Sequence, residues 1–217
     1  MNYSVVIVAA GKGLRLDLGY NKVYYPLVAN QTMLETTMRT FDLDKECQEI
    51  VVVTEKEEYD KYVTQTFSTP IKVVAGGNNR QESVTNGVAV VTEDMVMIHD
   101  GARPYVTSRI LEDAKATMEK FDACCVMVKT TDTISRVENG VVVETLSRNQ
   151  LMNAQTPQCF RTELIRDCLA KAAAAGFHGT DDVSVVLAFS DAKVAVVEGD
   201  YANYKITTRE DLKVRIG

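Results

Sequence analysis

A cluster of glycines and cations follows the first apolar run of the chain. Residues 9–22 read AAGKGLRLDLGYNK and contain Gly11, Lys12, Gly13, Arg15 and Lys22. Glycines let the backbone approach phosphate oxygens closely, and the amides of such a turn form an anion site. The segment lacks the GK[ST] sequence of a P-loop and the third glycine of a dinucleotide fingerprint. Because the cations are clustered in one loop, the pattern predicts a triphosphate site.

A carboxylate with a cation three residues further on stands at the end of another apolar run. Asp100 ends the run MVMIHD and is followed by Gly101, Ala102 and Arg103. Mg²⁺ takes one or two carboxylates together with substrate phosphates, so one well-placed aspartate can suffice to hold it. We therefore expect Asp100 to bind Mg²⁺, with a turn or helix-capping aspartate as the alternative. Lys205, late in the chain, is either a second phosphate-side cation or a surface lysine.

The elements that must position these residues alternate along the chain. Strands are expected at 3–10, 50–53, 71–75, 95–98, 123–128 and 193–197. Helices are expected at 31–41, 108–120 and 162–175, across 84–91, from 208, and from Glu55 with Thr54 and Glu57 as a capping box. This alternation is typical of βαβ units in a largely parallel sheet. Ligands of such sheets bind at the carboxyl ends of the strands, so we place the glycine loop and Asp100 at that edge.

One pair of β-rich segments interrupts the alternation. Residues 133–137 and 141–146 flank Glu138-Asn139-Gly140. Asn-Gly between two such segments is a strong signal for a β-hairpin. Two interpretations stay open at this point: a plain hairpin at the sheet edge, or an arm that reaches a second subunit.

Length, charge and cysteine content limit the class of protein. The 217 residues are expected to form a single domain, 1–217. A net charge of −6 without a basic run argues against nucleic-acid binding. No segment approaches the roughly 20 apolar residues of a membrane span, and no basic region precedes the first apolar run, so we expect a cytoplasmic protein without membrane contact. The 5 cysteines show no CxxC spacing, and the 2 histidines are far apart, which argues against disulfides, zinc sites and a histidine triad.

Seven motifs in register resemble a known family. AAGKGLRLDLGYNK, AGGNNRQESV, HDGARP, DTI, RNQLMNAQTPQ, GTDDVS and NYKITTREDL occur in the order and spacing of the 2-C-methyl-D-erythritol 4-phosphate cytidylyltransferases. The first motif is shared by many sugar nucleotidyltransferases, whereas HDGARP with RNxxxxxQTPQ narrows the field to pyrimidine nucleotidyl transfer onto polyol phosphates. The resemblance implies a Rossmann-like, mostly parallel twisted sheet flanked by helices. It also implies a protruding β-hairpin dimerisation arm over about residues 132–152.

The resemblance further implies an activity of non-mevalonate isoprenoid precursor biosynthesis: transfer of CMP from CTP to 2-C-methyl-D-erythritol 4-phosphate, with Mg²⁺ at Asp100 and release of pyrophosphate. The catalytic cations would be Arg15, Lys22 and Lys205. The nucleotide would be bound by Ala9, Ala10, Gly11, Gly13, Gly77, Asn78, Arg80, Ser83 and Gly101. The acceptor would be bound by Arg103, Thr133, Thr180 and Lys205, and by Arg148 from the arm of a second chain in a homodimer. The attacking group is a phosphate whose second pKa lies near 6, so the reaction requires no general base.

Some positions depart from the usual pattern of this family, and two other functions compete with the first. Val8 and Val23 are departures, and Asn78-Asn79 replaces a more acidic pair, which loosens the expected choice of pyrimidine. Ribitol 5-phosphate is the alternative acceptor, although the run at 179–182 favours methylerythritol phosphate. A non-catalytic dinucleotide-binding module is the alternative from another class, and the missing third glycine argues against it.

Overall fold

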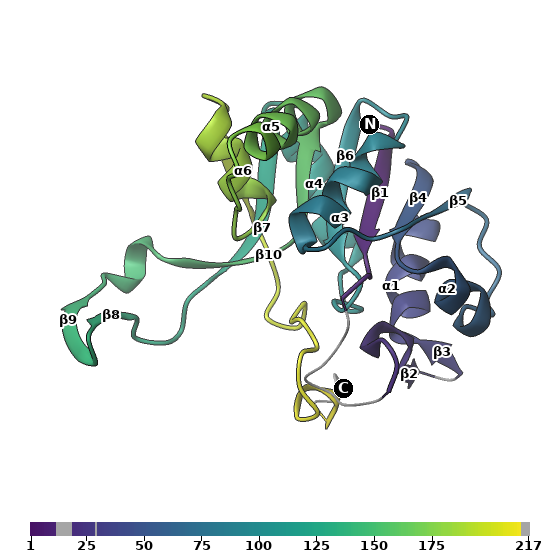
Figure 1. Cartoon of the computed structure of the whole chain (residues 1–217), viewed down its shortest axis with the longest axis horizontal. Helices are drawn as coiled ribbons and strands as arrows, with labels where there is room; N and C mark the ends of the chain where they lie inside the picture. Colours follow the sequence, from purple (N-terminus) through teal and green to yellow (C-terminus); the bar gives the residue numbers. More distant parts are fainter. Residues whose placement is uncertain (12–18, 29, 214–217) are drawn as a thin grey trace.

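A twisted central sheet lies between two layers of helices (Figure 1). The computed structural model describes residues 1–11, 19–28 and 30–213. Within these residues the central sheet has 7 strands in the order β11-β7-β10-β6-β1-β4-β5. They are β1 (Tyr3–Val8), β4 (Cys47–Val53), β5 (Ile71–Val74), β6 (Met95–Asp100), β7 (Ala123–Lys129), β10 (Met152–Arg161) and β11 (Val194–Glu198). Every neighbouring pair is parallel except the two pairs that β10 makes, which confirms the mostly parallel sheet.

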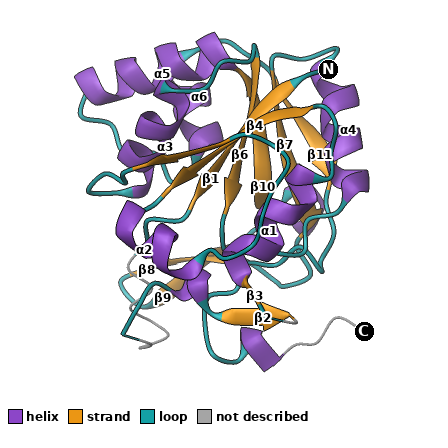
Figure 2. Ribbon diagram, turned by 90° about the vertical axis from the view of Figure 1, so that its right-hand side faces the viewer, coloured by secondary structure: helices purple, strands orange, loops and turns teal. Residues whose placement is uncertain are grey.

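Helices cover both faces of the sheet, as Figure 2 shows. Helices α1 (Met33–Asp42) and α4 (Ser108–Met118) cover one face, and α3 (Arg80–Ala89), α5 (Thr162–Ala174) and α6 (Asp182–Phe189) cover the other. Because strand side chains alternate between faces, Val5 and Ile7 of β1 pack towards α1 and α4, whereas Val6 packs towards α3. Burial on both faces explains why β1 reads as a continuous apolar run.

Helix α3 lies unusually close to the sheet at one position. A Cβ atom added to Gly87 would lie 2.5 Å from Val6 Cγ1 and 2.8 Å from Val53 Cγ2. The absence of a side chain at Gly87 therefore lets the backbone of α3 pack directly on β1 and β4. This contact holds the second half of α3 against the sheet, and the first residues of the same helix border the candidate site.

Two of the expected helix starts differ from the sequence prediction. Helix α2 (Lys56–Tyr62) is preceded by Glu55, which makes no side-chain cap, so the capping box of Thr54 and Glu57 is wrong. Thr54 is fully buried, and its hydroxyl lies 2.8 Å from the hydroxyl of Tyr24, which explains why it does not cap the helix. The helix expected from 208 corresponds, within the described residues, to a 3₁₀ turn, η3 (Asp211–Lys213).

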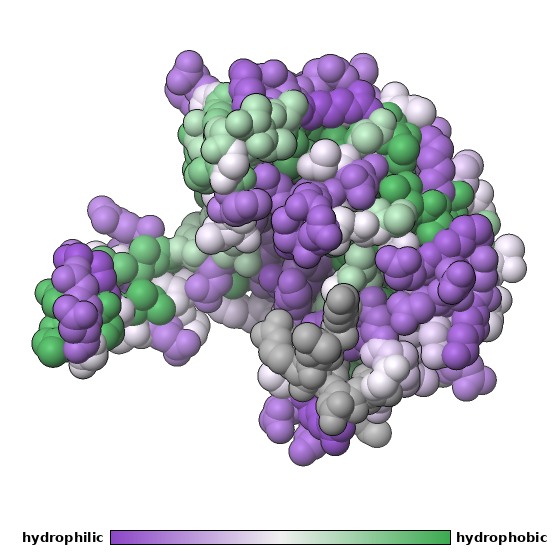
Figure 3. Space-filling model, viewed as in Figure 1, coloured by the Kyte–Doolittle hydropathy of each residue, from purple (hydrophilic) through white to green (hydrophobic). Residues whose placement is uncertain are grey.

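The predicted hairpin is confirmed and projects from the body of the molecule (Figure 1). Strands β8 (Ser135–Glu138) and β9 (Val141–Thr145), followed by the 3₁₀ turn η2 (Arg148–Gln150), lie between β7 and β10. Asn139 and Gly140 have φ angles of 51° and 81°, the left-handed conformations of a type I′ turn. Val137, Val141 and Val142 are 55%, 63% and 60% exposed, and apolar atoms gather on this arm in Figure 3. The arm thus carries apolar surface that its own chain does not cover.

The remaining short elements connect β1 to α1. They are the 3₁₀ turn η1 (Lys22–Tyr24) and the two-stranded pair β2 (Pro26–Val28) and β3 (Gln31–Thr32). Thr32 caps α1 through a capping box with Glu35. Among the residues that the structure describes, none of the helices combines the length and the apolar character needed to cross a membrane.

Candidate active site

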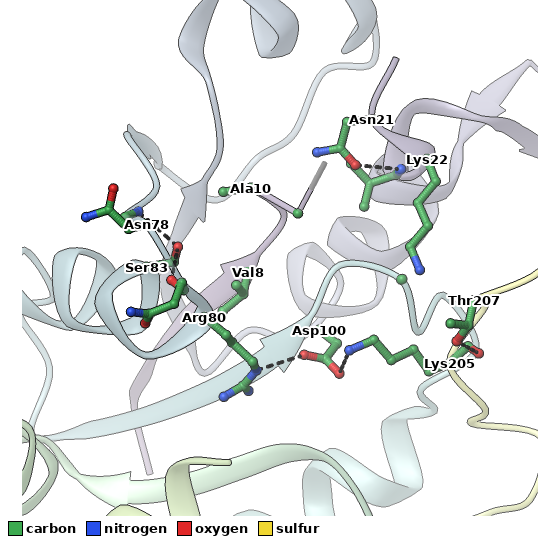
Figure 4. A pocket seen from close by; sticks show the side chains of 15 residues that line it. Val8, Ala10, Asn21, Lys22, Asn78, Arg80, Ser83, Asp100, Lys205 and Thr207 are labelled. Carbon is green, nitrogen blue, oxygen red and sulfur yellow. Dashed lines mark hydrogen bonds and ion pairs between the residues drawn. The ribbon is translucent and has the colours of Figure 1, made fainter. Parts of the chain in front are cut away.

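A pocket of about 640 Å³ opens at the carboxyl ends of β1 and β6 (Figure 4). From β1 the chain proceeds to β4 and β5 and then returns to β6 on the other side of β1. Val8 at the end of β1 is the register partner of Asp100 at the end of β6. The pocket therefore lies at the switch point where open α/β sheets bind their ligands. Residues expected in the site that line it are Ala10, Gly11, Lys22, Gly77, Asn78, Arg80, Ser83, Asp100 and Lys205.

Asn21 and Lys22 form the wall that follows the glycine loop. The Asn21 side chain donates to the Ala9 carbonyl and accepts from the Val23 amide, so it joins the two ends of the loop. Lys22 begins η1, and its Nζ donates to the carbonyl of Ile206 at 2.6 Å. This bond ties the loop wall to the C-terminal part of the chain. The predicted residues Gly13 and Arg15, and their neighbour Lys12, lie outside the described residues.

The start of α3 forms the opposite wall. Asn79 caps α3 by accepting from the Glu82 amide at 2.9 Å. Ser83 Oγ accepts from the Gly77 amide at 3.0 Å and donates to the Asn79 carbonyl at 2.9 Å. The Asn78 amide and side chain both donate to Glu82 Oε2, which fixes the orientation of the Asn78 side chain. The glycine-rich segment is thus held as a tight turn at the positive end of a helix dipole.

Asp100 lies among three cations at the floor of the pocket. Its Oδ2 is 2.9 Å from Lys205 Nζ and 3.6 Å from Arg103 Nε, and its Oδ1 is 3.5 Å from Arg80 Nε. Burial by itself raises the pKa of Asp100, but Lys205, Arg80 and Arg103 outweigh it and hold the pKa well below its usual range. The carboxylate is therefore ionised over the whole physiological pH range.

The segment 203–207 packs against the turn that follows Asp100. The Ile206 amide donates to the Ala102 carbonyl at 2.9 Å, and Arg103 Nη1 donates to the Asn203 carbonyl at 2.7 Å. These bonds bring Lys205 and Arg103 to the same carboxylate although they are about a hundred residues apart in the sequence. Thr207 lines the pocket beside them.

Arg80 is shared between two carboxylates. Its Nη1 and Nη2 donate to Asp182 Oδ1 and Oδ2 at 3.0 and 2.8 Å, in a two-pronged ion pair. Asp182 stands at the start of α6 and is 1% exposed. The motif GTDDVS therefore reaches the site through Asp182, whereas the predicted acceptor residue Thr180 is exposed and does not line the described pocket.

His99 supports the turn without facing the pocket. Its Nε2 lies 3.0 Å from the Arg103 carbonyl, which can only accept, so Nε2 carries the proton. Its Nδ1 then accepts from the Thr156 hydroxyl, and the same hydroxyl oxygen accepts from the Asp100 amide, each at 3.0 Å. Burial lowers the pKa of His99 to about 4, so the ring is neutral and holds Asp100 and Arg103 through directed bonds.

The other predicted site residues lie apart from the described pocket lining. Ala9 and Gly101 are the backbone neighbours of lining residues and do not themselves line the pocket. Thr133 and Arg148 lie on and beside the projecting arm, where Arg148 Nη1 donates to the Thr131 carbonyl at 3.1 Å. Figure 1 shows the arm directed away from the body of its own chain.

Several functional positions were not predicted. Asn21, Asn79 and Thr207 line the pocket, and Asp182, His99 and Thr156 support it. A signal was present for most of them, because they lie inside the motifs YNK, GGNNR, GTDDVS, HDGARP and QTPQ. Most of these residues are next to, or close to, a predicted site residue in the sequence. Sequence proximity alone does not show which side chains point into the pocket, because that direction depends on the tertiary fold.

The charges of the site differ from those of the chain. The described site contains four cations and two carboxylates: Lys22, Arg80, Arg103, Lys205, Asp100 and Asp182. Its net charge is therefore +2, whereas the net charge of the whole chain is −6. A glycine-rich turn, a helix start and a buried carboxylate among cations at a switch point are the features of a nucleotide-binding α/β enzyme that handles phosphoryl groups.

Comparison with known proteins identifies the family. Residues 3–215 match the family described as IspD, 2-C-methyl-D-erythritol 4-phosphate cytidylyltransferase, and the chain belongs to this family. Relatives named as that cytidylyltransferase include one from Bacillus thuringiensis, 39% identical over 98% of this chain and 95% of that protein. Another, from Halalkalibacterium halodurans, is 41% identical over 98% of this chain and 94% of its own length.

Solved structures of related proteins have the same fold as this chain. The synthase of 4-diphosphocytidyl-2C-methyl-D-erythritol from Anaerococcus prevotii has a TM-score of 0.84 and 32% identity, and covers 97% of this chain and 94% of that one. The cytidylyltransferase structure from Francisella tularensis has a TM-score of 0.85 and 29% identity, and the match covers 98% of this chain and 97% of that one. The mostly parallel sheet flanked by helices that was expected from the sequence is therefore confirmed.

Proposed function

We propose that this protein transfers CMP from CTP to 2-C-methyl-D-erythritol 4-phosphate and releases pyrophosphate, as a step of isoprenoid precursor biosynthesis by the non-mevalonate pathway. The observation that carries the proposal is the position of Asp100 and Lys205 on the floor of a nucleotide-sized pocket, with Lys22 on its loop wall. Membership of the family supports the choice of substrates.

The residues of the pocket suit attack by a phosphate oxygen on the α-phosphorus of CTP. The barrier arises from two anions that meet and from negative charge that builds on the phosphorus. Lys22 and Lys205, from opposite ends of the chain, both line the pocket and supply positive charge there, since Lys22 Nζ bonds the carbonyl of Ile206 beside Lys205. The described pocket lining contains no histidine, and the nearby His99 is neutral and engaged on both ring nitrogens. This agrees with an acceptor that needs no general base.

Mg²⁺ is part of the proposal, with Asp100 as its protein ligand. The carboxylate keeps its charge at neutral pH, and one such ligand suits a cation that is held mainly by nucleotide phosphates. Among the described residues no group of three or more His, Cys, Asp or Glu side chains is arranged to hold a metal, which agrees with this single-carboxylate mode. The cation would supply electrostatic stabilisation of the triphosphate.

A homodimer with composite active sites is also part of the proposal. The exposed valines of the arm, on β8 and β9, form an apolar surface that a second chain would cover. Thr133 and Arg148, expected to bind the acceptor, would reach the pocket of the partner, because the arm projects away from the body of its own chain. The cytoplasmic location expected from the sequence stays a prediction.

The acceptor assignment is tested by pyrophosphate release. The protein is incubated with CTP, Mg²⁺ and either 2-C-methyl-D-erythritol 4-phosphate or ribitol 5-phosphate, with UTP as a control nucleotide. We expect release with the methylerythritol acceptor at a kcat/KM at least about a hundredfold above that with ribitol phosphate, since the polar contacts of a site are left unpaired by the wrong acceptor. A preference for ribitol phosphate would overturn the acceptor assignment.

A further inference from the structure

Arg80 makes two unequal ion pairs across the floor of the pocket. Its two terminal nitrogens bond Asp182 at 3.0 and 2.8 Å, whereas its Nε stays 3.5 Å from Asp100 Oδ1. Figure 4 shows the guanidinium beside Asp100, with Lys205 on the other side of the carboxylate. The arginine therefore bonds fully to the distal carboxylate and only approaches the one in the pocket.

The backbone around Asp182 is anchored to the neighbouring strand β10. The amides of Asp182 and Val183 both donate to Gln158 Oε1 at 3.1 Å. Gln158 Nε2 in turn donates to Asp181 Oδ2 at 2.9 Å, and Asp181 caps α6 through a capping box with Ser184. Strand β10 thus fixes the backbone of Asp182 at the start of α6, from which its carboxylate reaches Arg80.

The two oxygens of Asp100 have different surroundings. The ion-pair contacts of Lys205 and Arg103, at 2.9 and 3.6 Å, are made to Oδ2, whereas the contact of Arg80, at 3.5 Å, is made to Oδ1. Oδ1 is accordingly the oxygen suited to a divalent cation. A guanidinium at full hydrogen-bond distance from Oδ1 would compete with such a cation for the same lone pairs.

We propose that Asp182 is a positioning residue that holds Arg80 away from Oδ1 of Asp100 and so keeps that oxygen available to the divalent cation that accompanies the nucleotide. The proposal rests on the proposed function, because it takes Asp100 as the metal ligand. Without the charge of Asp182, the guanidinium of Arg80 is left with Asp100 as its carboxylate partner and bonds to it, because a partly buried charge without a partner is unfavourable.

Cation binding provides the direct test. Binding of Mn²⁺ to the protein with saturating CTP is measured by electron paramagnetic resonance, and the Mg²⁺ concentration for half-maximal pyrophosphate release is measured in parallel. Asp182→Asn should weaken Mn²⁺ binding about tenfold, the order expected when a charge-assisted hydrogen bond must be broken first. Asp191→Asn, which removes an exposed carboxylate outside the site, should bind Mn²⁺ like the wild type.

A second variant separates positioning from a loss of folding. Adding Arg80→Gln to Asp182→Asn removes the competing guanidinium, so the double variant should recover most of the lost Mn²⁺ affinity. Unchanged Mn²⁺ binding in Asp182→Asn, or a loss that persists in the double variant, would overturn the proposal. Failure of the wild type to bind Mn²⁺ with CTP or to release pyrophosphate would instead count against the proposed function.

Discussion

At the scale of single residues, the site depends on charges that are distant in sequence and converge on Asp100. Lys205 and Arg103 share one carboxylate oxygen, and Arg80 approaches the other. The types of these residues were predictable from motifs, because each was expected in the site. Their partners were not predictable: nothing in the motif GTDDVS indicates that Asp182 is nearly fully buried against Arg80.

Among the described cations, Lys205 is expected to be the one whose substitution lowers kcat most. Lys205→Ala removes the nearest positive charge to Asp100 and one that is proposed to stabilise the reacting phosphates, so kcat should fall about a hundredfold or more. The measurement is the steady-state rate of pyrophosphate release at saturating CTP. Lys120→Ala, on the exposed turn after α4, serves as the control and should leave kcat within about twofold of the wild type. Equal rates for the two variants would remove Lys205 from its role.

His99 gives the stability a defined pH dependence. Burial lowers its pKa to about 4 in the folded protein, against an ordinary value of 6.5. Between these values the unfolded chain binds a proton that the folded chain does not, so the contribution of His99 to stability is complete above about pH 6.5 and is lost as the pH falls towards 4. From about pH 7 to pH 5 the loss due to this residue should be about 2 kcal/mol.

Urea unfolding of the wild type and of His99→Asn at these two pH values isolates that contribution. The free energy of unfolding of the wild type should fall by more than that of the variant, because asparagine does not titrate. The same decrease in both proteins would show that His99 is not buried in its neutral form.

At the scale of elements, most strands and helices followed from hydrophobic period, and the misses have physical reasons. Strand β10 was not predicted because its sequence is polar and contains Pro157, which cannot donate to a ladder. The structure accommodates this proline with a register irregularity between Ala154 and Gln158 against β7.

Helix α6 was not predicted because its DVSVVLAF sequence is rich in β-branched residues and apolar on most sides. Its capping box with Asp181 and Ser184 and its packing on α5 override that propensity.

Helix α3 provides a test at this scale. Gly87→Ala should place a methyl group against Val6 and Val53 and lower the free energy of unfolding by about 1–3 kcal/mol, since overpacked methyl groups force the backbone to shift. Because the same shift would move Asn79 and Arg80 at the start of the helix, KM for CTP should rise as well.

Urea unfolding and CTP kinetics check this prediction. Thr85→Ala on the exposed face of α3 is the control and should change stability by no more than about 0.5 kcal/mol. A Gly87→Ala variant as stable as the wild type would contradict the close packing of α3 on the sheet.

At the scale of the whole molecule, the arm connects the fold to the proposed dimer. The Asn139-Gly140 turn made the hairpin predictable. Its direction was not predictable from pattern, because the two strands are exposed along their whole length and no core side chain fixes them to the body. The proposed composite site assigns Thr133 and Arg148 to the pocket of a second chain, because they lie on and beside an arm that is directed away from the body of its own chain.

Mixing two inactive variants tests the composite site. Lys22→Ala damages the pocket of a chain and Arg148→Ala damages its arm, so each homodimer should be nearly inactive. After dissociation and joint reassembly, mixed dimers contain one intact site, and the activity should recover to about a quarter of the wild type because half of random dimers are mixed. No recovery, with mixed dimers demonstrated by a mass tag, would contradict a site built from two chains.

The central claim is nucleotidyl transfer from CTP to a methylerythritol phosphate, and ³¹P nuclear magnetic resonance of one reaction mixture tests it most directly. With CTP, Mg²⁺, acceptor and protein, we predict that the CTP signals are replaced by equal amounts of pyrophosphate and of a diphosphodiester, and that CTP persists when the acceptor is omitted. Persistence of CTP with the acceptor present, or its hydrolysis to CMP without formation of a diphosphodiester, would contradict the account.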